Sequence, residues 1–248
     1  MSRELQGGIL MLVGIVTLRV SWGTTYLNYV KEGMRPWLLL SGAVLLVLGL
    51  LAVIDAVRGR GDEDDPQDSE GESEGEPGDG HVHAHGGPRT AWLLLLPVFT
   101  LFVVAPPALG AYSASRDVTN SVAAPQLLPP LPPGDPVPMY LSDYVTRAVW
   151  EKGVSLEGRT VTVTGFVLPT QQGWQLARLQ ILCCAADAFT SKAQPTNLPA
   201  GFARPPADTW VTVTGHWVPG GGTESGTAIP LLEVESIVEI EQPVNPYD

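Results

Sequence analysis

Charged residues are scarce in this sequence. They make up 16% of its 248 residues, against about 25% in ordinary soluble domains. Basic residues are the scarcer kind, since 14 Lys and Arg stand against 26 Asp and Glu and leave a formal charge of −12. A basic nucleic-acid-binding protein is therefore excluded. Cysteine is nearly absent too, and two cysteines cannot form the framework of a disulfide-rich secreted protein.

The acidic residues are concentrated in one part of the chain. Ten of the 26 lie between Asp62 and Asp79, and without them the formal charge would be −2. The remainder is apolar enough to give the whole chain a mean hydropathy of +0.13. In addition, 23 prolines and 27 glycines predict long irregular segments. This segregation excludes a single compact soluble domain.

Three apolar stretches are long enough to cross a lipid bilayer, whose hydrocarbon core requires about 20 residues of helix. They comprise residues 5–30, 36–57 and 91–111. The first is too long for a secretion signal and has no small-residue cleavage site. We therefore expect a transmembrane helical hairpin over residues 1–57 and a third transmembrane helix over residues 89–111. A re-entrant or interfacial third segment is the alternative.

Small residues recur at every seventh position in the first two stretches. Small side chains allow the backbones of membrane helices to approach closely. The pattern predicts a tightly packed hairpin, although glycine is also generally frequent in membrane helices. The two rows are Gly7, Gly14 and Ser21, and Gly42, Gly49 and Ala56.

The basic residues that flank the apolar stretches indicate an orientation. More of them lie on the side of the amino terminus than in the first loop, and an excess of basic residues marks the cytoplasmic side. We therefore expect a multi-pass protein of the cell membrane whose C-terminal domain is extracytoplasmic. The residues compared are Arg3, Arg58, Arg60 and Arg89 on one side and Lys31 and Arg35 on the other.

Arg19 is a charged residue near the middle of the first stretch, where its insertion costs about 2.5–3.5 kcal/mol. It is a candidate for contacting a partner subunit or for lining a pathway. The alternative is that the helix is shifted along the chain and that Arg19 extends to the membrane surface.

Composition predicts two linkers. Residues 58–88 alternate acids with Gly, Ser and Pro, so we expect a disordered acidic linker. It contains His81, His83 and His85, whose spacing would place three imidazoles on one side of an extended chain, as a weak site for Zn²⁺, Ni²⁺ or Cu²⁺. A solvated linker without a metal is the alternative. Residues 112–138 are rich in proline and are expected to form an extended spacer.

Residues 139–248 have the pattern of a domain of short strands. After a helix expected over residues 140–150, polar and apolar residues alternate as in half-buried strands. Val161–Gly165 and Val211–Gly215 both read Val-Thr-Val-Thr-Gly, and a glycine inside a strand indicates a bulge or coiling. The fold class that we predict is an α-helical membrane region followed by an all-β, OB-like small barrel. The expected strands cover residues 159–168, 175–184, 209–218 and 228–240.

An OB-like barrel suggests oligonucleotide binding, but the composition of this domain does not. From Leu141 onward there are eleven acids and six bases, whereas affinity for nucleic acid depends largely on neutralising phosphates. We therefore expect no nucleic-acid partner. No nucleophile elbow, phosphate-binding loop or zincin motif occurs either, so we predict a protein that is not an enzyme.

The two cysteines are adjacent, at Cys183 and Cys184. Regular strand alternation would place Cys183 in the core and leave Cys184 accessible. Three interpretations stay open: packing at a turn, binding of a metal or ligand together with Asp187 and His216, and redox or covalent chemistry. A lone histidine on a strand, such as His216, is more often a satisfied barrel residue than a ligand.

Several motifs together resemble the YcgQ-like family of bacterial membrane proteins. They are the run Cys183–Ala188, Asp208–Val211 with Gly215, the ending Pro243–Tyr247, and the loop Tyr29–Leu38. The resemblance implies an accessory subunit that partners a multi-spanning, YcgR-like permease, with a role in metal-ion handling. It makes Trp210 and Tyr247, together with Arg19, candidates for contacting that partner. The proline-rich stretch 194–206 departs from the family pattern and weakens the prediction of a third barrel strand there.

Three functional hypotheses result. The first is a membrane-anchored permease subunit whose outer domain contacts the permease or captures a ligand. The second is a protein that binds or senses Zn²⁺ or another divalent transition metal through His81, His83 and His85, and separately through Cys183, Cys184 and Asp187. The third is a membrane-tethered thiol redox protein.

Overall fold

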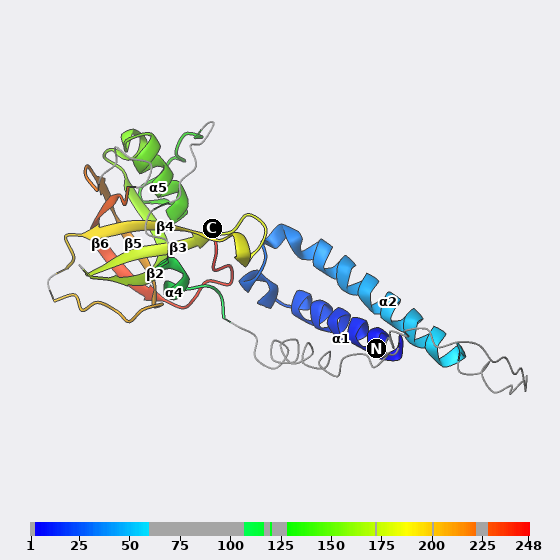
Figure 1. Ribbon diagram of the computed structural model, residues 1–248. Helices are drawn as coiled ribbons and strands as arrows, with labels where there is room; N and C mark the ends of the chain where they lie inside the picture. The colour runs from blue at the N-terminus through cyan, green and yellow to red at the C-terminus, as the bar shows by residue number, and fades with distance from the viewer. Residues whose placement is uncertain are drawn as a thin grey trace, which may run out of the picture. The chain divides into compact units, whose positions relative to one another are not determined.

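The computed structural model describes residues 3–59, 107–116, 120, 128–171, 173–199, 201–221 and 228–248. Contacts divide the chain into two compact units, coloured from blue to red along the sequence in Figure 1. The first unit comprises residues 1–24 and 33–106, and the second comprises residues 25–32 and 107–248. Residues 25–32 thus belong to the second unit, although in the sequence they lie between the two helices of the first unit.

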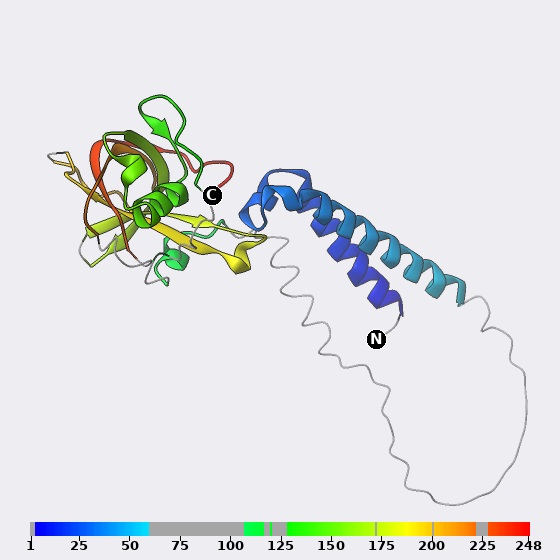
Figure 2. The same cartoon turned by 90° about the horizontal axis from the view of Figure 1, so that it is seen from above.

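The described part of the first unit is a pair of helices, α1 (Arg3–Trp22) and α2 (Arg35–Gly59), which lie side by side in Figures 1 and 2. One described helical stretch, Glu32–Arg58, contains an 18-residue window with a mean hydropathy of 2.7, and it is long and apolar enough to cross a membrane by length and composition. The apolar part of α1, Gln6–Trp22, is shorter than that test requires.

The sequence predicted three membrane spans. Among the described residues, one helix is long and apolar enough to be such a span. Most of the predicted third span lies outside them, and so do residues 60–88 of the predicted acidic linker, whose first two residues belong to the end of α2. The described end of that span, residues 107–111, belongs to the second unit. The predicted first span also extended too far: α1 ends at Trp22, and Thr25–Asn28 form a separate 3-10 helix, η1.

The two rows of small residues face each other between α1 and α2. A Cβ atom on Gly14 would lie 2.9 Å from the carbonyl oxygen of Gly42, and one on Gly49 would lie 2.8 Å from the carbonyl oxygen of Gly7. These distances are shorter than real Cβ contacts, so only glycine permits this approach of the two backbones. The predicted tight hairpin is confirmed.

Arg19 does not lie mid-helix as the long predicted span implied. It is in the last turn of α1 and its side chain is exposed. A cation near the C-terminus of a helix interacts favourably with the backbone carbonyl groups there. This position fits the interpretation in which the helix is shifted and Arg19 extends to a surface.

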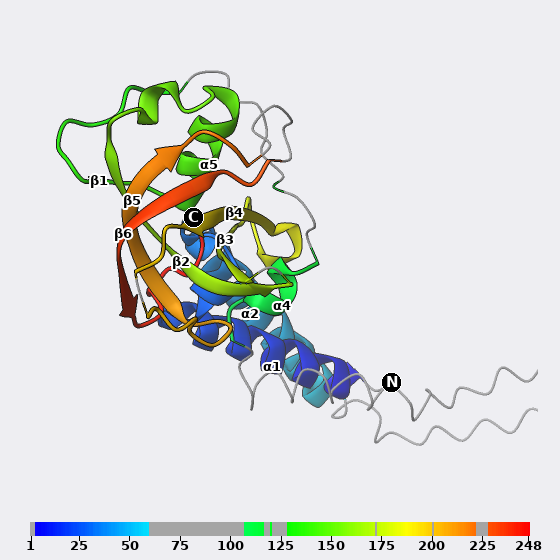
Figure 3. The same ribbon diagram turned by 90° about the vertical axis from the view of Figure 1, so that its left-hand side faces the viewer.

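The second unit is built on a mixed β-sheet, which curves round on itself in Figure 3. Five strands form a closed ring of pairings in the order β2, β3, β4, β6, β5 and back to β2, and the short β1 adds to β2. The β1–β2 and β4–β6 pairs are parallel and the others antiparallel. The strands are β1 (Val137–Pro138), β2 (Thr160–Thr170), β3 (Gly173–Gln180), β4 (Phe189–Thr196), β5 (Trp210–Val218) and β6 (Leu231–Ile240).

The two Val-Thr-Val-Thr-Gly repeats are neighbours in this sheet. Val163 pairs with Val213 in the antiparallel register of β2 and β5, and both valines are buried in the core. On the other face, the Thr162 and Thr214 hydroxyls lie 3.1 Å apart. A β-bulge follows Thr214, at the second repeat's Gly215, as the glycine inside that strand predicted.

One helix closes the core of the barrel. Helix α5 (Leu141–Trp150) buries Tyr144, Val145 and Ala148 against the inner residues of the strands. The Tyr144 hydroxyl donates a hydrogen bond of 2.6 Å to the Leu231 carbonyl oxygen. The domain is therefore not purely β as predicted, because the apolar face of α5 supplies part of the core.

The described residues of the predicted spacer, 112–138, pack on the domain instead of extending from it. Asn120 is buried, and its side chain bonds to both the N–H and the carbonyl group of Lys192 at 2.7 and 3.0 Å. Pro129 accepts a hydrogen bond from Arg147. The strand β4 also runs through Pro195, where the proline-rich pattern argued against a strand.

Candidate functional site

The paired cysteines lie on a turn that begins where β3 ends, at Gln180. Ile181 is buried, but the next residues leave the strand and Cys183 is exposed, whereas Cys184 is partly buried. The prediction that Cys183 is a core residue is therefore wrong, because strand alternation does not extend past Gln180. Both thiols are free.

The Asp187 carboxylate holds this turn together. One carboxylate oxygen accepts the Leu182 N–H at 2.9 Å, and the other accepts the N–H groups of Cys183 at 2.8 Å and Cys184 at 3.4 Å. In return, the Cys184 sulfur accepts the backbone N–H of Asp187, which forms a capping box at the start of the 3-10 helix η5 (Ala185–Asp187). The carboxylate thus satisfies three backbone donors that the turn would otherwise leave open.

Hydrogen bonding also sets the protonation of the site. The hydrogen bond from the Cys183 thiol, with those from the backbone, lowers the pKa of Asp187 to about 2. The same bond to Asp187, followed by one to Cys184, raises the pKa of Cys183 to about 12. Near neutral pH the turn therefore holds a carboxylate beside a neutral Cys183 thiol.

These side chains form a three-ligand cluster. One ligand atom from each of Cys183, Cys184 and Asp187 lies within 4.8 Å of the others. Ligand atoms around a tetrahedral Zn²⁺ lie roughly 3.3–3.8 Å apart, given bonds of about 2.0–2.3 Å. A small contraction of the cluster would therefore place two sulfurs and one oxygen around a metal and leave a fourth position open.

Residues 25–32 pair with the same turn. The Lys31 N–H donates to the Cys183 carbonyl oxygen at 3.1 Å, and the Ala185 N–H donates to the Tyr29 carbonyl oxygen at 2.7 Å. Between these bonds, Val30 and Cys184 form an antiparallel bridge. The segment thus adds a short backbone pairing to the turn that carries the cysteines.

His216 does not join this cluster. Its Nδ1 lies 3.2 Å from the Arg159 carbonyl oxygen and its Nε2 lies 2.8 Å from a Glu235 carboxylate oxygen. The sequence-based preference for a satisfied barrel residue over a metal ligand agrees with these contacts. The other predicted metal ligands, His81, His83 and His85, lie outside the described residues.

Trp210 and Tyr247, the residues expected to contact a partner, are both buried within the domain. Trp210 packs edge-on against Phe166, with ring centroids 5.5 Å apart. The Tyr247 hydroxyl accepts the Leu109 N–H at 3.0 Å and donates to the Asn28 carbonyl oxygen at 2.8 Å. Their contacts join parts of this chain, which argues against a direct role for either side chain on a partner surface.

Sequence reasoning missed a buried ion pair in the same domain. Arg178 Nε lies 2.7 Å from a carboxylate oxygen of Asp248, and both side chains are buried. The Arg178 guanidinium also donates to the carbonyl oxygens of Thr164 at 3.3 Å and Asn245 at 3.1 Å. Strand alternation alone leaves a charged residue such as Arg178 on the solvent-facing side of β3, and no local pattern shows that Asp248 returns to cover it.

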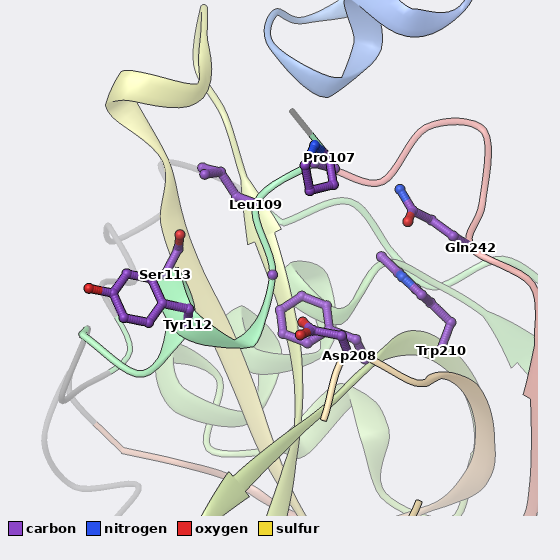
Figure 4. A pocket seen from close by; sticks show the side chains of 10 residues that line it. Pro107, Leu109, Tyr112, Ser113, Asp208, Trp210 and Gln242 are labelled. Atoms are coloured by element: carbon purple, nitrogen blue, oxygen red, sulfur yellow. The ribbon is translucent and has the colours of Figure 1, made fainter. Parts of the chain in front are cut away.

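A pocket of about 430 Å³ lies beside Trp210 and Asp208, as Figure 4 shows. Tyr112, Ser113 and Gln242 also line it. Asp208 is its one charged lining residue, and the Asp208 carboxylate accepts the backbone N–H of Ala111. Because the pocket offers one charged side chain and the turn gathers three metal-ligating ones, the cysteine turn remains the stronger candidate site.

The fold and the site define a chain with a helical N-terminal part and a C-terminal mixed β-sheet domain that carries a turn of paired cysteines. Residues 144–247 match the DUF1980 C-terminal domain, an uncharacterised family, so this chain contains such a domain. The match covers most of the second unit, and it does not confirm the YcgQ-like resemblance. No curated protein and no solved structure shows a significant match to the chain.

Proposed function

We propose that the protein is a membrane-anchored, non-enzymatic subunit whose C-terminal domain captures a thiophilic divalent metal ion, such as Zn²⁺, at Cys183, Cys184 and Asp187. The observation that carries the proposal is the cluster of three ligand atoms within 4.8 Å on an accessible turn. Sulfur ligands favour Zn²⁺ and other soft metals over Mg²⁺ and Ca²⁺.

Two features favour a metal over the other roles considered for the cysteines. A packing role does not account for Cys183, because its side chain is exposed. A redox role is less well supported, because the raised pKa of Cys183 leaves little of the nucleophilic thiolate near neutral pH. Metal capture tolerates this, since a bound metal displaces the thiol proton.

The three-ligand set supports an accessory role with a permease. Structural zinc sites are closed by four protein ligands, whereas three ligands leave room for water or for a ligand from another molecule. Such a site suits an ion that is captured and then passed on. The implied partner is a YcgR-like permease, and the resemblance of the sequence motifs supports that choice.

The proposed architecture is a multi-pass anchor with three transmembrane helices and an extracytoplasmic, OB-like barrel. The apolar helix over Glu32–Arg58 and the tight packing of α1 on α2 support the anchor. The closed ring of five strands supports the barrel, because an OB fold is a five-stranded barrel.

Titration calorimetry with Zn²⁺ on the full-length protein in detergent, under reducing conditions, tests the metal proposal. The His81→Ala/His83→Ala/His85→Ala variant removes the linker histidines, and we expect it to retain one site. Adding Cys183→Ser/Cys184→Ser should abolish that site. Ala186→Ser on the same turn is the matched control and should bind as before. Equal binding with and without the two cysteines would refute the proposal.

The accessory role is tested separately by affinity purification in a gentle detergent. A polytopic permease should accompany the protein in a stoichiometric amount. The purification is repeated after cross-linking in the membrane. Recovery of this chain alone in both cases would count against the accessory role and would leave the proposal of metal capture unaffected.

A further inference from the structure

The segment 25–32 is attached to the candidate site by its backbone. Its two hydrogen bonds to the turn use the Cys183 carbonyl oxygen and the Ala185 N–H. Within the segment, Tyr26 and Leu27 are buried, with exposed fractions of 5% and 7%. Asn28 is fixed through its carbonyl oxygen by the Tyr247 hydroxyl. The segment is therefore held to the domain at Asn28, Tyr29, Val30 and Lys31.

The groups that hold the segment and the groups that would hold a metal belong to the same few residues. Cys183 supplies a thiol to the cluster and a carbonyl oxygen to Lys31. Cys184 supplies a second thiol and forms the bridge with Val30. Ala185, whose N–H bonds to Tyr29, lies between the two ligand residues Cys184 and Asp187.

The conformation of the turn links these two sets of groups. Its backbone is fixed by the bonds from three N–H groups to the Asp187 carboxylate. That backbone conformation gathers the three ligand atoms, and it also aims the Cys183 carbonyl and the Ala185 N–H at the segment. Fixing the turn in this conformation through one set of groups therefore favours the other set.

We infer that metal occupancy of the turn and docking of residues 25–32 are thermodynamically coupled, so that each stabilises the other. The inference rests on the proposed metal site and describes its regulation. A ligand that binds one conformation better than others increases the population of that conformation, and the coupling is reciprocal.

The first test is a backbone substitution in the segment. Lys31→Pro removes the N–H that donates to Cys183, and we expect it to weaken Zn²⁺ binding by about tenfold, within the roughly 5- to 150-fold range typical of coupled sites. Lys31→Ala is the matched control, because it retains the N–H and changes only the side chain. It should bind Zn²⁺ as the unaltered protein does.

The second test needs no variant of the segment and so remains decisive if Lys31→Pro fails to fold. Saturating Zn²⁺ should slow hydrogen exchange at the Lys31 and Ala185 amides of the full-length protein. It should have no such effect in Cys183→Ser/Cys184→Ser. Unchanged exchange at Lys31 in a protein that binds Zn²⁺ at the cysteines would overturn the coupling and leave the proposed function intact. Absence of Zn²⁺ binding at the cysteines would overturn both.

Discussion

At the scale of single residues, the domain places His216 where its partners select one charge state. His216 has an acceptor oxygen at each ring nitrogen, from the Arg159 backbone and from the Glu235 carboxylate. Both bonds are satisfied at once only when both nitrogens carry a proton. The Arg159 carbonyl and then Glu235 accordingly raise the pKa of His216 above its usual 6.5.

This arrangement predicts a pH-dependent stability. Because the pKa is raised in the folded state, the stabilisation is fully present below about pH 6.5 and is lost as the pH rises through the folded value. The pair is exposed, so we expect about 0.5 kcal/mol, or roughly 2–4 °C in melting temperature between pH 6 and pH 8. Thermal unfolding of the full-length protein and of His216→Ala at both pH values measures it. Equal pH dependence in the two proteins would contradict this assignment.

Arg178 and Asp248 form an ion pair within the domain. The ion pair is buried, so removal of Arg178 leaves the Asp248 carboxylate without a counter-charge. We expect Arg178→Met to destabilise the domain by about 3–5 kcal/mol. The double variant Arg178→Met/Asp248→Leu should recover part of that loss, because no unpaired charge remains. Urea unfolding checks both, and a double variant no more stable than Arg178→Met would show that the ion pair is not the cause.

At the scale of helices and strands, local patterns predicted four strands but missed β4 and the two-residue β1. The alternation in residues 159–168 and 209–218 corresponds to β2 and β5, since one buried face per strand is a property of nearby residues. The strand β4, in contrast, includes Lys192 and Pro195 and shows no alternation. It forms because β3 and β6 lie on either side of it and pair with its backbone.

The packing of α1 on α2 predicts the effect of one glycine substitution. Gly14→Leu would drive a side chain into the Gly42 carbonyl and the Leu46 backbone, both 2.9 Å from the position of its Cβ. We expect destabilisation by about 1–3 kcal/mol, as for other overpacked sites. Gly8→Leu is the matched control, because a Cβ there meets nothing within 4 Å. Thermal stability in detergent, followed by size-exclusion chromatography, should fall for Gly14→Leu only; an equal fall in both variants would rule out helix packing as the cause.

At the scale of the whole molecule, the proposed orientation places the second unit outside the cytoplasmic membrane. Val154 is 69% exposed on this unit and offers a position for a probe. In a Cys183→Ser/Cys184→Ser background, Val154→Cys should react with a membrane-impermeant maleimide in intact cells, once any outer membrane has been made permeable to the reagent. Labelling that appears only after the cytoplasmic membrane is opened would show that the second unit lies on the cytoplasmic side, which contradicts the proposed orientation.

The sequence by itself determined the apolar helical hairpin, its rows of small residues and four of the strands, because each depends on the periodicity of neighbouring residues. Only the tertiary structure decided the environment of the cysteines. The exposure of Cys183 depends on where β3 ends, and the pairing of Val30 with Cys184 joins residues far apart in the chain. The burial of Arg178 likewise depends on Asp248 returning to cover it. Such long-range pairings arise from the closure of the barrel, which no local pattern of residues encodes.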